Sequence, residues 1–140
     1  MPNNLTPNFT EIISIIEKAK TKIYKAVNNG LIDMYWEVGE YISLKVAEND
    51  WGEGTIQEFS HYIQHHYPDM KGFSPSNLWR MKQFFETYKD EPKLAPLVRE
   101  ITWSNNILIM AGAKSNEARE FYIKLCIKTM GGFLDQTGSF

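Results

Sequence analysis

The chain has 140 residues, of which 43% are hydrophobic and 14% aromatic, and its formal net charge is −2. This length suits one domain with its own core, and the aromatic content excludes a disordered chain. The negative charge excludes a protein that coats nucleic acid or anionic membranes with its whole surface, so any such binding has to come from a local patch.

The N-terminal residues "MPNNLTPNFTE" contain neither a basic region nor an apolar run, so they do not fit a signal peptide. No apolar stretch approaches the ~20 residues that a transmembrane helix needs. We therefore expect a cytoplasmic protein with no membrane partner. The single cysteine, Cys126, excludes an internal disulfide, and its helical apolar setting favours a small buried side chain over a catalytic thiolate.

The first predicted helix is long. Apolar residues recur at helical spacing from Phe9 onward, and Thr6-Pro7 supplies a start signal before them. The series 16, 20, 23, 27, 31, 34, 38 and 42 crosses Asn28-Asn29-Gly30 without losing phase, with Lys20 as its one polar member. A loop would usually reset that phase, so the pattern favours one helix, able to bend at Gly30, over two helices with a turn. Gly30 opposes this reading by about 1 kcal/mol relative to alanine.

Two short amphipathic helices are predicted next, over residues 55–67 and 75–88. The turn residues "ENDWGEG" precede the first, and Pro68 and Gly72 separate the two. Ser74-Pro75 places a capping hydroxyl before a proline at the first helical position of the second. In that helix, the face expected to meet the core carries Leu78, Met81, Phe85 and Tyr88.

The last third of the chain predicts two more helices. A polar loop, "KDEPKLAP", leads to a short helix at residues 104–111, and Ser115 caps a final helix that reaches Lys128. The run "ILIM" is the one candidate for a buried strand, but it is short and has no partner strand. The chain is therefore predicted to be all-α, with about five helices and a helix-turn-helix-like central pair. Residues 1–8 are expected to form a tail, residues 9–128 one helical domain and residues 129–140 an irregular, glycine-rich tail.

The central pair is the best candidate for a binding site. A helix-turn-helix places its second helix in the DNA major groove, although the connection here is longer than the usual three or four residues. Arginine suits guanine edges, asparagine and glutamine suit adenine edges, and serine and lysine reach phosphates. Residues 71–85 carry a charge of +3 and no acid. The candidate DNA contacts are Lys71, Ser76, Asn77, Arg80, Lys82 and Gln83.

An ordinary solvated helix face remains the alternative to this DNA interface, because such faces carry the same residue types. Trp79, at the edge of that face, is expected to pack rather than to stack on a base. His61 and His65 have a spacing that can hold zinc, but no third ligand is evident, so a polar surface is the favoured reading. Asp33, Glu37 and Glu40 likewise fit a solvated face.

Motifs for catalysis are missing. The sequence contains no P-loop, no GxGxxG, no GxSxG and no convincing nuclease core of carboxylates and lysine. We expect no enzyme activity from this chain, no metal site and no cofactor.

Several stretches resemble the N-terminal domain of the YhcG family of bacterial proteins. They are "LIDMYWEVGEYI", "WGEGTIQEFSHYIQHHYPDMKGFSPSNLWRMKQFFETY", "ITWSNNILIM" and "EAREFYIKLCIK", in the family's order, and the resemblance covers about residues 9–128. It implies a helical, DNA-binding-like module that usually precedes a PD-(D/E)xK nuclease domain in restriction or genome-defence settings. It also implies packing, capping or turn roles for most of the family's signature positions. In this chain these are Tyr35, Trp36, Glu37, Gly39, Trp51, Gly52, Phe73, Ser74, Asn77, Leu78, Met81, Phe84, Trp103 and Asn106.

The sequence departs from the family after Lys128, where members usually continue through a basic stretch toward the nuclease. Here "TMGGFLDQTGSF" follows, without the nuclease residues. The expected function is a non-catalytic module that binds double-stranded DNA. The alternative is a protein-interaction module whose long first helix forms a homodimer or holds a nuclease partner chain. A two-fold dimer would satisfy both, because paired recognition helices read paired half-sites.

Overall fold

The computed structural model describes residues 9–130, and within this range the secondary structure is entirely helical. Five α-helices and one short 3-10 helix occur in the order α1 Phe9–Ala47, α2 Glu53–His66, α3 Pro75–Tyr88, η2 Leu97–Glu100, α4 Trp103–Gly112 and α5 Asn116–Met130. The all-α prediction is confirmed, and the "ILIM" run lies in α4 rather than in a strand. The Thr6-Pro7 start signal and the residues predicted to form the N-terminal tail lie outside the described range, as does the chain after Met130.

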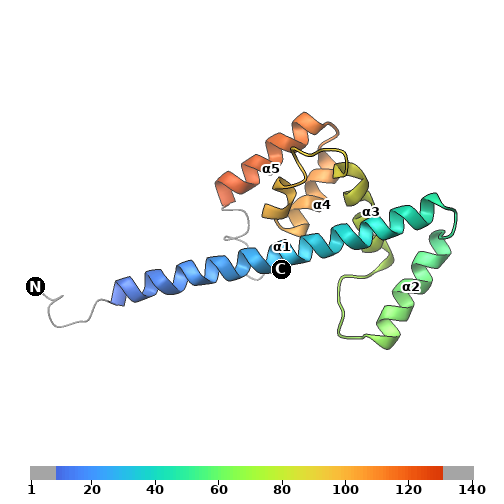
Figure 1. Ribbon diagram of the computed structural model, residues 1–140, viewed down its shortest axis with the longest axis horizontal. Coiled ribbons are helices and arrows are strands. Elements are labelled where there is room, and N and C mark those ends of the chain that lie inside the picture. The colour runs from blue at the N-terminus through green and yellow to red at the C-terminus, as the bar shows by residue number, and fades with distance from the viewer. Residues whose placement is uncertain (1–8, 131–140) are drawn as a thin grey trace, which may run out of the picture.

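Helix α1 runs through Gly30 without interruption, as Figure 1 shows. The continuous apolar phase therefore predicted the helix correctly. The side chain of Asn28, which looks like a turn residue in the sequence, is buried instead. Its Nδ2 donates hydrogen bonds to the carbonyl oxygens of Arg99 (3.1 Å) and Ile101 (3.0 Å). Asn28 thus ties α1 to η2 and to the residue that follows it.

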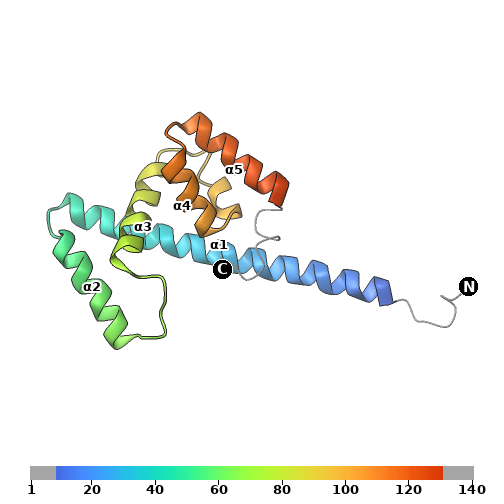
Figure 2. The ribbon, with the colours of Figure 1, turned by 180° about the vertical axis from the view of Figure 1, so that it is seen from behind.

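Helix α1 forms the spine of the molecule. Figures 1 and 2, seen from opposite sides, both place α4 and α5 on one side of α1 and α2 on the other. Helix α3 packs along α1 and contributes to two hydrophobic clusters. One cluster joins α3 to α1 and α2 through Ile42, Ile56, Leu78 and Met81. The other joins the end of α3 to α1, η2, α4 and α5 and includes Ile32, Phe84, Tyr88, Val98, Ile109 and Ile123.

The contact between α1 and α3 is close enough to involve backbone. Gly39 of α1 is buried, and a Cβ built on it would lie 2.0 Å from the carbonyl oxygen of Met81. Real Cβ atoms do not approach an oxygen so closely. Only glycine at position 39 therefore allows α3 to pack at this distance from α1.

One core assignment on α3 was wrong. The sequence pattern placed Phe85 in the core with Leu78, Met81 and Tyr88, but Phe84 is the fully buried residue and Phe85 is half-buried. Helix α3 is covered by α4 as well as α1, so Phe84 packs edge-on against Trp103 at a centroid distance of 5.1 Å. Helical spacing alone allows either phenylalanine.

Candidate nucleic-acid interface

The start of α3 is fixed by a Ser-Pro cap. The Ser74 Oγ accepts a hydrogen bond from the backbone N–H of Asn77 (3.2 Å), and Pro75 occupies the first turn, as predicted. Before this cap, Gly72 adopts a φ of 90°, which disfavours other residues. The loop is also held from α2, because the Ser60 Oγ donates to the carbonyl oxygen of Phe73 (2.7 Å). Helices α2 and α3 therefore have a defined connection despite its length.

Asn77 uses its side-chain amide to hold this arrangement. Its Nδ2 donates to the carbonyl oxygen of Gly72 (2.6 Å), and its Oδ1 accepts from the Trp103 Nε1–H (2.9 Å). The amide therefore links the loop, α3 and α4. Among the predicted DNA contacts, Asn77 is the one whose side chain serves the fold directly.

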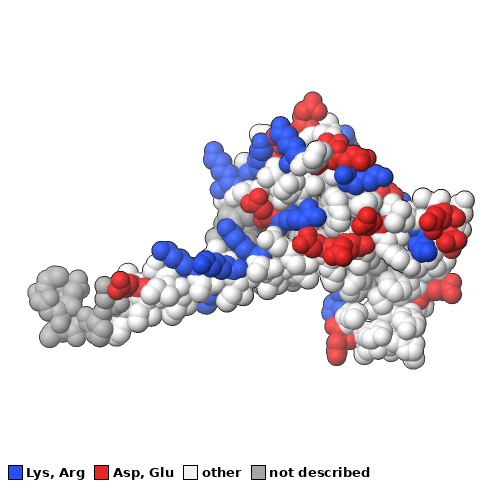
Figure 3. All heavy atoms as spheres, in the orientation of Figure 1, with Lys and Arg blue, Asp and Glu red and all other residues white. Residues whose placement is uncertain are grey.

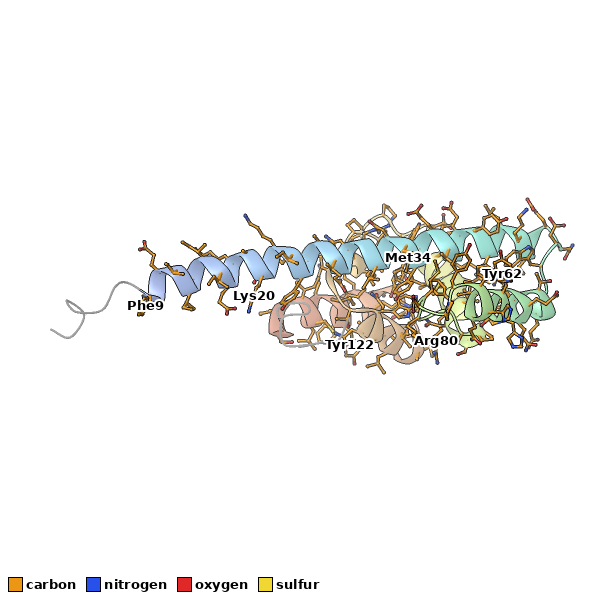
Figure 4. All side chains as sticks on the ribbon, turned by 90° about the horizontal axis from the view of Figure 1, so that it is seen from below. Phe9, Lys20, Met34, Tyr62, Arg80 and Tyr122 are labelled. Carbon is orange, nitrogen blue, oxygen red and sulfur yellow. The ribbon has the colours of Figure 1, made fainter. Side chains whose placement is uncertain are left out.

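Four of the other predicted contacts are exposed: Lys71, Ser76, Arg80 and Gln83. Within residues 9–130, the side chains of Lys71, Arg80 and Gln83 form no hydrogen bond or ion pair, and the Ser76 Oγ lies 3.5 Å from the Ser74 Oγ. Figure 4 places Arg80 on the side of the body away from α1. The structure thus brings these four residues to the outside around the first half of α3.

Lys82 is placed differently. Its Nζ forms an ion pair with Glu86 (3.1 Å) and lies 5.6 Å from the ring centroid of Trp79, which is half-buried. Burial alone would raise the pKa of Glu86. The Ser43 hydroxyl, Lys82 and nearby Lys89 outweigh that effect and lower the pKa below its usual value. The charge of Lys82 is therefore partly offset by Glu86, which lies just beyond the acid-free window.

The electrostatics of the N-terminal end of α3 favour an anion. The first turn contains no acidic residue, and the helix dipole places partial positive charge there. Lys71 and Ser74 line a cavity of about 430 Å³ beside this end, together with Ile63, Gln64, Pro68, Met70, Gly72 and Phe73. Figure 3 shows a contrasting surface over the middle of α1 and over α5, where acidic and basic side chains alternate.

The histidines and Cys126 were the other candidates for binding or chemistry in the sequence. His61, His65 and His66 are exposed, and the rings of His65 and His66 lie 5.0 Å apart. Within the described part of the chain, no three His, Cys, Asp or Glu residues come together in a way that could hold a metal ion. Cys126 is half-buried, and desolvation raises the pKa of its thiol. None of the helices between residues 9 and 130 is both long and apolar enough to span a membrane.

Sequence reasoning missed Ser60, and it did not predict the partner of Trp103, a signature position of the family. Ser60 is fully buried on the apolar face of α2, between Ile56 and Ile63, and its position in that series was the available signal. Trp103 holds the amide of Asn77 and also packs against Tyr35 at a centroid distance of 4.5 Å. The pairing of Trp103 with Asn77, 26 residues earlier, has no local signal in the sequence.

Comparison of the chain with known proteins shows which family it belongs to. Curated proteins and solved structures give no match to the chain. The family described as the DUF1016 N-terminal domain matches residues 11–131, which is most of the chain. The resemblance to the N-terminal domain of the YhcG family is confirmed by this match. The chain belongs to the DUF1016 N-terminal domain family.

Proposed function

We propose that this domain is a non-catalytic module that binds duplex DNA through the outward side of α3. One observation carries the proposal. Helix α3 and the loop before it present the exposed side chains of Lys71, Ser76, Arg80 and Gln83 around a helix N-terminus that has no acidic residue in its first turn. Such a surface attracts phosphates even on a chain of net negative charge. The attraction acts locally, and acidic groups more than about 10 Å away are largely screened by salt.

Each exposed side chain has a role that suits its chemistry. Arg80 would donate two hydrogen bonds to a guanine edge, and Gln83, on the next turn, would pair with an adenine edge. Lys71 and Ser76, beside the helix start, would contact phosphates and set the register of the helix in the groove. Asn77 would act indirectly, by fixing the loop and α3 to α4.

Lys82 would contribute less than its position in the sequence suggests. Its ion pair with Glu86 has to break before the ammonium group can reach a phosphate. A nuclease, which the family resemblance implies as the associated activity, would act at the DNA to which this module binds.

The test is DNA binding measured by fluorescence anisotropy at several salt concentrations. The double variant Lys71→Glu/Arg80→Glu should lose at least ~100-fold in affinity, because two phosphate or base contacts become repulsive. For the unmodified protein, log K should fall linearly with log salt concentration. Lys114→Glu/Lys128→Glu is the matched control, since it makes the same charge change at two exposed lysines away from α3. Equal binding by both double variants would show that α3 is not the interface.

A further inference from the structure

The N-terminal part of α1 carries an apolar stripe that nothing in the described chain covers. We refer to residues 9–27 as the arm. Figure 1 shows α1 extending well past the other helices, and the first buried residue of α1 is Asn28. The apolar series predicted from the sequence is therefore packed only in its second half, from Leu31 to Ile42. The exposed apolar side chains of the arm include Phe9 (59%), Ile12 (57%), Ile13 (54%), Ile15 (63%), Ile16 (43%), Ile23 (58%) and Val27 (45%).

The spacing within the arm is that of a coiled coil. Phe9, Ile13, Ile16, Lys20, Ile23 and Val27 alternate steps of four and three residues, which is the a/d pattern of a heptad repeat. Figure 4 shows the side chains of the arm from Phe9 to Lys20 without another helix beside them. We refer to these a and d positions as the seam. In coiled coils, the residues of such a seam pack against a second helix.

The arm is poorly suited to exist as a lone helix in water. Isolated helices of this length are marginal even when rich in alanine. Five isoleucines and one valine lower the helix propensity further, because β-branched side chains lose rotamer freedom. The arm continues a helix that the body already nucleates, and a packing partner would add the tertiary contacts from which most helical stability in proteins comes.

We propose that the partner is a second copy of this chain, with the two arms packed side by side in antiparallel orientation. Roughly 600 Å² of apolar side chain is exposed per arm, so a pair would bury on the order of 1,200 Å², which reaches the range of specific interfaces. In an antiparallel pair centred near Lys18, each core layer contains one residue from each copy, and the two residues lie equally far from Lys18 on opposite sides of it. Phe9 meets Val27, Ile13 meets Ile23 and Ile16 meets Lys20.

The charges of Lys20 and Glu17 favour the antiparallel over the parallel orientation. In a parallel pair the two Lys20 ammonium groups would share one core layer, and like charges at that distance repel. In the antiparallel pair Lys20 lies along the same edge of the seam as Glu17 of the second copy, and the symmetry repeats this contact. The arm thus supplies both the apolar layers and a complementary charge pair. This proposal is independent of DNA binding by α3, which lies on the body.

Sedimentation equilibrium of the full chain over a wide range of concentration tests the interface. The unmodified protein should show a monomer–dimer equilibrium. Ile23→Glu should raise the dissociation constant at least ~10-fold, because it buries a carboxylate against Ile13 of the second copy. Ile15→Glu is the matched control: Ile15 is 63% exposed on the same arm but lies off the seam. A monomer at every concentration, or equal effects of the two variants, would overturn the proposal.

The orientation has its own test in the same assay. Lys20→Glu and Glu17→Lys should each weaken the dimer, and the double exchange should restore it, since the contact is re-formed with its charges reversed. A double variant no tighter than the single ones would overturn the antiparallel arrangement. Lys71→Glu/Arg80→Glu should dimerise normally, so loss of DNA binding and loss of the dimer can be told apart.

Discussion

Replacing Gly39 with alanine tests the packing of α1 on α3, on which the position of the proposed interface depends. The new Cβ would lie 2.0 Å from the carbonyl oxygen of Met81, 2.6 Å from its carbonyl carbon and 3.2 Å from the backbone nitrogen of Lys82. All three atoms belong to the backbone of α3, so no side-chain rotation relieves the contact. The two helices have to separate by about 1.5 Å to reach an ordinary van der Waals distance.

The magnitude follows from two opposing effects. Overpacking of a well-packed core costs about 3 kcal/mol at the upper end of its usual range. Alanine at a helical position gains about 1 kcal/mol over glycine. Gly39→Ala should therefore lower the free energy of unfolding by about 2 kcal/mol, a substantial part of the stability of a small domain.

Gly30→Ala is the matched control, because no atom lies within 4 Å of a Cβ built on Gly30. The same chemical change on the same helix should here raise the free energy of unfolding by up to ~1 kcal/mol. Urea denaturation followed by circular dichroism at 222 nm measures both. If Gly39→Ala were as stable as Gly30→Ala, the close packing of α1 on α3 would be refuted.

Four further substitutions make predictions that urea denaturation can check. The buried hydroxyl of Tyr88 has no hydrogen-bond partner within the described residues, and burial raises its pKa to about 12. Tyr88→Phe should therefore raise the free energy of unfolding by about 1 kcal/mol. A lower free energy of unfolding would show that the hydroxyl has a partner. Asn77→Ala should cost about 1–3 kcal/mol by leaving the Trp103 indole N–H without its acceptor, whereas Ser76→Ala should change stability by less than about 0.5 kcal/mol. Glu86→Gln should cost no more than about 1 kcal/mol at neutral pH, since the carboxylate is exposed. The pKa of Glu86 is lowered in the folded state, so this difference should be fully present above the usual value of 4.5 and disappear as the pH falls through the lowered pKa; a difference that grows in acid would contradict that shift.

The helices were largely predictable because their signals are local. The Ser74-Pro75 cap marked the start of α3 correctly, and the unbroken apolar phase identified α1 as one helix. The choice between Phe84 and Phe85 was not local, because it depends on α4 covering α3 from a second side. The same holds for Asn28, whose acceptors lie 71 and 73 residues later in the chain.

The sequence predicted which residues lie at the candidate interface. It did not predict which of their side chains are exposed and which bind other parts of the fold. A helical wheel shows that Arg80 and Gln83 face away from Leu78 and Met81, and both are exposed. It does not show that Asn77 is held by α4. The packing roles implied for most of the family's signature residues agree with the surroundings of Gly39 and Asn106. Asn106 is fully buried and donates hydrogen bonds to the carbonyl oxygens of Val98 and Thr102.

The most direct test of DNA binding through α3 is a titration of isotope-labelled protein with duplex DNA, followed by the backbone amide signals in two-dimensional NMR. The amides of residues 71–83 should shift first and furthest, and those of the α4–α5 side should stay in place. Shifts that gather on the arm or on α5, or no shifts at low salt, would contradict the account.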